Sequence, residues 1–70
     1  MNVQIIREAL RRRPFEPFRI TLSSGEVHEV WHPEFAFFLQ TNLVIGYAGT
    51  DRLAVCSILH ITSMEALQPS

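Results

Sequence analysis

The chain has 70 residues, 47% of them hydrophobic, and its formal net charge at pH 7 is −1. This length allows one domain at most, spanning residues 1–70. The near-zero charge gives no global field that would attract nucleic acid or anionic lipid. The single cysteine, Cys56, excludes an intrachain disulfide and a four-cysteine zinc site, and it is expected to be a small core side chain.

The longest apolar run, Phe35 to Leu39, is far too short to cross a membrane. The first residues lack the charge-first order of a secretion signal, so we expect a cytoplasmic protein without a membrane span. A domain of this size is marginally stable alone. Its high apolar content therefore predicts a homo-oligomer, with part of the aromatic surface facing another copy.

The first predicted element is a helix over about residues 2–12. Asn2 suits an N-cap, and Val3, Ile6 and Leu10 recur at helical spacing. Pro14 cannot continue the helix and pushes the preceding residue toward an extended backbone. So short a helix is unstable in isolation, so its apolar stripe must dock on the rest of the chain.

Short extended segments follow the helix. Phe18, Ile20 and Leu22 alternate with polar residues, which is typical of a half-buried strand. Residues 34–40 fit either a strand or a short helix. The whole pattern predicts a mainly β, α+β fold with a helix covering one end of a five-stranded antiparallel SH3-like or Sm-like barrel. Six extended segments can be marked, one more than that barrel has strands: 18–22, 26–32, 36–40, 43–47, 52–56 and 61 to about 67.

The hairpin around Ser23-Ser24-Gly25 allows two registers. A two-residue turn would place Val27 and Trp31 inward, whereas a three-residue turn would bury His28 and Val30 instead. The second register is preferred, because Glu29 would otherwise point into the core.

Residues 28–32 read HEVWH, which matches the H-E-x-x-H pattern of zinc metalloproteases. That chemistry needs a helix, where the two imidazoles lie one turn apart on the same face and can reach one metal ion. Gly25 and Pro33 bound the segment, and a hairpin return is expected there. On a strand the two histidines would stand roughly 13 Å apart. The pattern is therefore interpreted as coincidental, with His28 and His32 as strand or turn residues and no metal.

No constellation typical of catalysis or of cofactor binding stands out, so the prediction is that the protein is not an enzyme and holds no cofactor. A basic cluster near the start offers a different function. Arginines beside Phe15 and Phe18 could hold phosphates while the rings stack on single-stranded bases. Nucleic-acid binding is therefore the alternative function, through Arg7, Arg11, Arg12, Arg13 and Arg19.

Four stretches resemble a group of short bacterial proteins of unknown function: RRRPFEPFRI (11–20), LSSGE (22–26), HPEF (32–35) and LHIT (59–62). The resemblance spans nearly the whole chain and implies a compact domain. The order of helix, strand, glycine turn and further strands is also similar to Sm-like barrels, which implies assembly through strand edges. Residues 33–35 and 57–60 occupy the places of the two RNA-reading motifs of Sm-like proteins and do not match them.

The sequence thus favours a non-enzymatic, self-associating module that binds a protein partner through an edge strand or an aromatic patch. The expected interface residues are Trp31, Phe35, Phe37, Phe38 and Tyr47.

Overall fold

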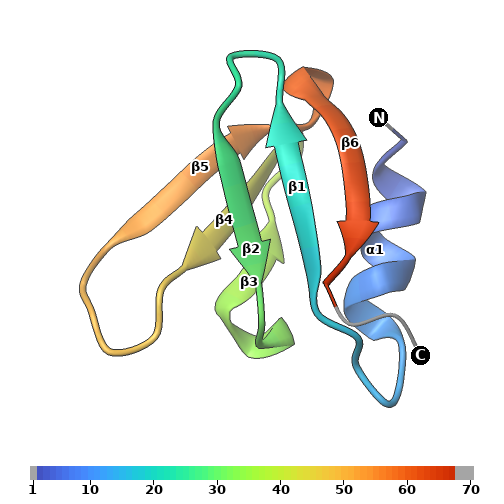
Figure 1. Ribbon diagram of the computed structural model, residues 1–70, viewed down its shortest axis with the longest axis vertical. Coiled ribbons are helices and arrows are strands. Elements are labelled where there is room, and N and C mark those ends of the chain that lie inside the picture. The colour runs from blue at the N-terminus through green and yellow to red at the C-terminus, as the bar shows by residue number, and fades with distance from the viewer. Residues whose placement is uncertain (1, 68–70) are drawn as a thin grey trace.

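The computed structural model describes residues 2–67, which form one α-helix, six strands and two 3-10 turns (Figure 1). The strands make two three-stranded antiparallel sheets. The first sheet has the order β2-β1-β6 and the second sheet has the order β3-β4-β5. The elements are α1 (Val3–Arg11), β1 (Phe18–Leu22), β2 (Val27–Val30), η1 (Pro33–Phe35), β3 (Ala36–Phe38), β4 (Asn42–Gly46), β5 (Leu53–Ser57), η2 (Ile58–His60) and β6 (Ile61–Ala66).

The predicted α+β class and the N-terminal helix are confirmed. The side-chain oxygen of Asn2 accepts a hydrogen bond from the backbone N–H of Gln4 at 2.8 Å, so this residue caps α1 as the sequence suggests. Arg12 has an extended backbone and ends the helix. None of the helices in residues 2–67 has the length and apolar character that spanning a membrane requires.

The β1–β2 hairpin adopts the three-residue turn. Gly25, with a φ of 92°, occupies the left-handed region that favours glycine, and the Leu22 N–H donates to the Glu26 carbonyl at 2.8 Å. In the resulting register Ile20 faces His28. Val30 is therefore only 2% exposed while Val27 is 48% exposed, which confirms the register preferred from the sequence.

The expected barrel of five strands differs from the structure in both strand number and closure. Among the residues described, the strands number six, and the hydrogen-bonded ladder breaks into two sheets. Pro33 has no N–H to continue a ladder, so the chain turns through η1 between β2 and β3. The turn η2 interrupts the chain in the same way between β5 and β6. Residues 34–40, left open between helix and strand, contain the end of η1 followed by β3.

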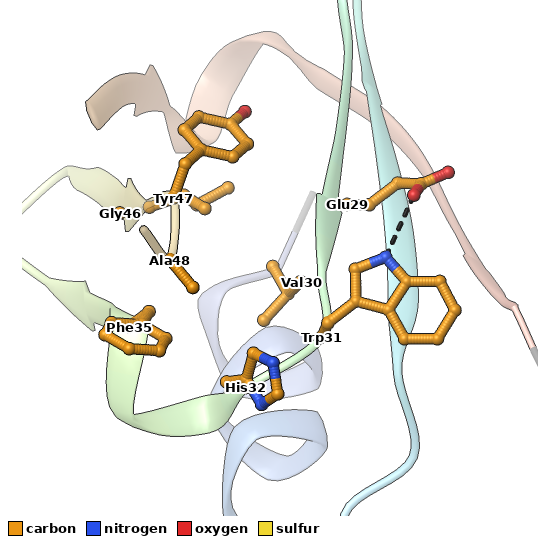
Figure 2. A pocket seen from close by; sticks show the side chains of 9 residues that line it. Glu29, Val30, Trp31, His32, Phe35, Gly46, Tyr47 and Ala48 are labelled. Atoms are coloured by element: carbon orange, nitrogen blue, oxygen red, sulfur yellow. Dashed lines mark hydrogen bonds between the residues drawn. The ribbon is translucent and has the colours of Figure 1, made fainter. Parts of the chain in front are cut away.

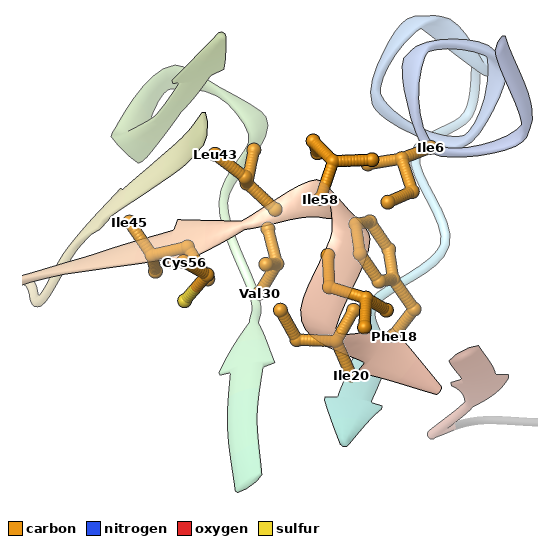
Figure 3. Close-up of a cluster of buried hydrophobic side chains, with 9 residues drawn as sticks. Ile6, Phe18, Ile20, Val30, Leu43, Ile45, Cys56 and Ile58 are labelled. Carbon is orange, nitrogen blue, oxygen red and sulfur yellow. The ribbon is translucent and has the colours of Figure 1, made fainter. Parts of the chain in front are cut away.

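The inner faces of the two sheets meet in one hydrophobic core, which α1 closes on one side (Figures 1 and 3). Figure 1 shows α1 beside β6, away from β5. Cys56 lies within this core, as expected for a small apolar side chain. The core residues are Ile6, Phe18, Ile20, Val30, Leu43, Ile45, Cys56, Ile58 and Ile61.

Candidate interaction surface

The HEVWH segment is extended, as predicted. His28 lies within β2, and His32 has a φ of −134° and a ψ of 118°. The two rings have different surroundings: the His28 side chain is mostly buried, whereas the exposed His32 ring packs edge-on against Phe35. Within residues 2–67, no three His, Cys, Asp or Glu side chains gather where they could hold one metal ion.

The ring of His28 is instead held at both nitrogens. Its Nε2 lies 2.7 Å from Glu26 Oε2, and its Nδ1 is hydrogen-bonded to the hydroxyl of Tyr47. Burial raises the pKa of Tyr47, so its hydroxyl stays protonated at neutral pH and serves as a hydrogen-bond group rather than as a nucleophile. The pair therefore ties β2 of the first sheet to the residue that follows β4 of the second.

These groups line a cleft of about 550 Å³ together with Arg52 and the start of β5. The cleft mixes charged and apolar side chains. Sequence reasoning missed this cluster, because nineteen positions separate His28 from Tyr47.

The structure brings three of the five predicted interface residues, Trp31, Phe35 and Tyr47, to the lining of one small cleft of about 190 Å³ (Figure 2). The indole Nε1–H of Trp31 donates to Glu29 Oε1 at 3.0 Å (Figure 2). Phe38 is half-buried against the core. Phe37 alone of the five projects from the outer face of the second sheet.

That outer face is apolar and uncharged. Phe37, Val44 and Val55 are direct cross-strand partners and form its central row. None of the residues of β3, β4 and β5 is charged. Four of the side chains are between 53% and 62% exposed, while Val44 is buried between its neighbours. We call this surface the outer apolar face and define it as Phe37, Leu39, Val44, Leu53 and Val55.

The outer face of the first sheet has the opposite character. Arg19 stands between its two cross-strand partners, 3.3 Å from Glu29 and 2.9 Å from Glu65. The hydrogen bond from Trp31 and then that from Arg19 lower the pKa of Glu29. Opposite charges that face each other across a ladder are a typical solvent-facing arrangement.

The candidate nucleic-acid arginines are partly occupied by contacts within the chain. Arg12 forms an ion pair with Glu16, and Arg19 is flanked by carboxylates as described above. The guanidinium of Arg7 lies 5.2 Å from the centre of the Phe38 ring. Arg13 donates to the carbonyls of Leu10 and Arg12, and Arg11 lies exposed at the end of α1.

No model of a protein family, no curated protein and no solved structure matches this chain.

Sequence reasoning found Phe37 but missed Leu39, Leu53 and Val55. A signal was present, since Leu53 and Val55 alternate with Ala54 and Cys56. A strand whose two alternating sets are both apolar is typical of a sheet covered on both faces.

Proposed function

We propose that the protein is a non-enzymatic, self-associating protein-interaction module. The observation that supports this most directly is the outer apolar face, a surface sheet without any charged residue. Antiparallel sheets that face water normally alternate between apolar and polar residues, as the first sheet does. Large exposed apolar patches mark interaction sites in soluble proteins.

The small size of the domain supports the same proposal. A chain of this length has room for one layer of buried side chains between its sheets, and such domains usually need a further source of stability. Burial of the outer apolar face against another molecule would supply one. The exposed indole of Trp31 lies at the smaller cleft and is available to a protein partner.

We assign the module to the SH3-like or Sm-like type of small β domain, on the order of its elements. One helix is followed by a glycine-containing hairpin and by further strands interrupted by short 3-10 turns. The likeness to SH3-like and Sm-like domains lies in the order of the elements, and it implies no particular ligand for this chain.

Light scattering over a concentration series of the purified chain tests self-association. The expected result is a mass that rises from one chain to at least two between about 1 µM and about 500 µM, the range of weak to moderate dissociation constants. A mass of one chain at every concentration would contradict the proposed function.

A further inference from the structure

We infer that two copies of this chain stack their second sheets, outer apolar face against outer apolar face, around a two-fold axis. This inference rests on the proposed function and specifies the surface that self-association uses. The two copies would form four layers, with the second sheets in the middle and the first sheets outside.

The second sheet has the residue pattern of a sheet covered on both sides. Its inner positions include Leu43, Ile45 and Cys56, which pack in the core against the first sheet. Its outer positions are equally apolar, yet four of the five side chains of the outer apolar face are more than half exposed. In the part of the chain that the structure describes, α1 cannot cover them, because it packs beside β6 (Figure 1).

A second copy fits this face in charge. A two-fold interface uses the same surface on both subunits. A charged residue near the axis therefore faces the same charge on the other copy. The outer apolar face has no charged side chain. Two copies can therefore approach without burying like charges, which would be costly.

The available area is also suitable for a second copy. The four exposed side chains present on the order of 400 Å² of apolar surface, at about 100 Å² for each half-exposed large side chain. A stable interface buries about 800 Å² on each partner. The polar ends of the same sheet, Asn42 and Ser57, and the neighbouring Phe35 would form the rim and bring the buried area to about 600 Å² on each partner, the lower end of the range for specific interfaces.

The stacking places the Phe37–Val44–Val55 row at the centre of the interface, with the two sheets about 10 Å apart. Because Phe37 lies on β3 and Val55 on β5, the row spans the whole width of the sheet. If two copies meet through the whole face, both Phe37 and Val55 lie in the interface. If they meet through the edge of one outer strand, only one of the two residues does.

The test compares three single-lysine variants by light scattering. Phe37→Lys and Val55→Lys each place a charge on the outer apolar face, and each is expected to raise the dissociation constant of the dimer about thirtyfold or more, as central interface residues do. Ser63→Lys is the matched control. Ser63 is exposed opposite Thr21 on the outer face of the first sheet, and this variant should associate like the unaltered chain.

The association of the three variants shows whether the copies meet face to face. If Phe37→Lys associates as tightly as the unaltered chain while Val55→Lys does not, the copies join through the β5 edge, and the face-to-face inference is overturned while the proposed function stands. If Ser63→Lys also dissociates, the effect is one of net charge and the inference fails. Circular dichroism checks that each variant is folded, and Leu39→Lys replaces Phe37→Lys if that variant is not. If the unaltered chain is monomeric, the proposed function itself fails.

Discussion

His28 and Tyr47 show how two ordinary side chains join the sheets. Each belongs to a different sheet region, and their contact depends on the hairpin register that turns His28 inward. The carboxylate of Glu26 at the second ring nitrogen fixes the orientation of the imidazole. A neutral imidazole that donates to the carboxylate through Nε2 accepts a hydrogen bond from the Tyr47 hydroxyl at Nδ1.

We predict that Tyr47→Phe lowers the free energy of unfolding by about 1 kcal/mol, the usual net value of one hydrogen bond. Urea denaturation measures the change. A double-mutant cycle with His28→Ala separates the shared contact from other effects, and a coupling energy near 1 kcal/mol is expected. A coupling energy of zero would show that the hydroxyl and the imidazole do not interact in solution.

Stability should also decline in alkali. Burial raises the pKa of Tyr47 and that of Cys56, so the unfolded chain releases these protons at a lower pH than the folded chain does. The folded state then binds more protons above about pH 9, and the free energy of unfolding falls as the pH rises through that range.

Urea midpoints measured from about pH 7 to about pH 10.5 check this, because the range spans the ordinary pKa values of cysteine and tyrosine in an unfolded chain. The Cys56→Ala variant should lose part of the decline, because its thiol no longer titrates. Adding Tyr47→Phe should remove more of it. An unchanged decline in the double variant would assign the effect to other groups.

At the scale of elements, α1 is stabilised by its docking on the two sheets. Neighbouring isoleucines in the helix have opposite environments: Ile6 is 0% exposed within the core, whereas Ile5 is 48% exposed. A nine-residue helix is not stable alone, so the burial of Ile6 and its neighbours holds it in place.

This contrast supplies an internal control for a prediction. Ile6→Ala should lower the free energy of unfolding by about 2–5 kcal/mol, because it leaves a cavity in the core. Ile5→Ala removes the same atoms from the preceding residue. It should lower the free energy of unfolding by well under about 1 kcal/mol, as surface substitutions usually do. Urea denaturation of the two variants makes the comparison. Equal losses would contradict the docking of α1 seen here.

The elements that could be predicted from the sequence are those with local causes. The helix begins at Asn2 and ends before Pro14 because a side-chain cap and a ring without an N–H act within a few residues. The hairpin register followed from keeping Glu29 out of the core. The division into two sheets was not predicted, because it depends on where η1 and η2 interrupt ladders between distant segments.

At the scale of the whole molecule, the two outer sheet faces differ in charge. The first sheet presents Arg19 with its carboxylate partners, and the second presents the outer apolar face. The proposed association through the second face would be driven by apolar burial, which is largely independent of ionic strength. Binding of phosphates by the arginines would instead weaken as the ionic strength rises.

We therefore predict that the dissociation constant of the self-associated form changes by less than about threefold between about 50 and 200 mM salt, a range over which phosphate binding weakens steeply. Light scattering at both salt concentrations measures it. A nuclease-treated sample is the control. Loss of the associated form after that treatment, or in the higher salt, would favour nucleic-acid binding through the arginine cluster.

The sequence by itself determined the helix, the hairpin, the extended state of HEVWH and the apolar character of the segments, because caps, proline and side-chain alternation act over a few residues. Only the tertiary structure decided which apolar side chains of the second sheet remain exposed. Leu43 and Val55 both stand in short apolar runs of the sequence, yet Leu43 is buried and Val55 is exposed. The difference arises because β-alternation assigns residues to two faces, and only the packing of one sheet on another decides which face meets water.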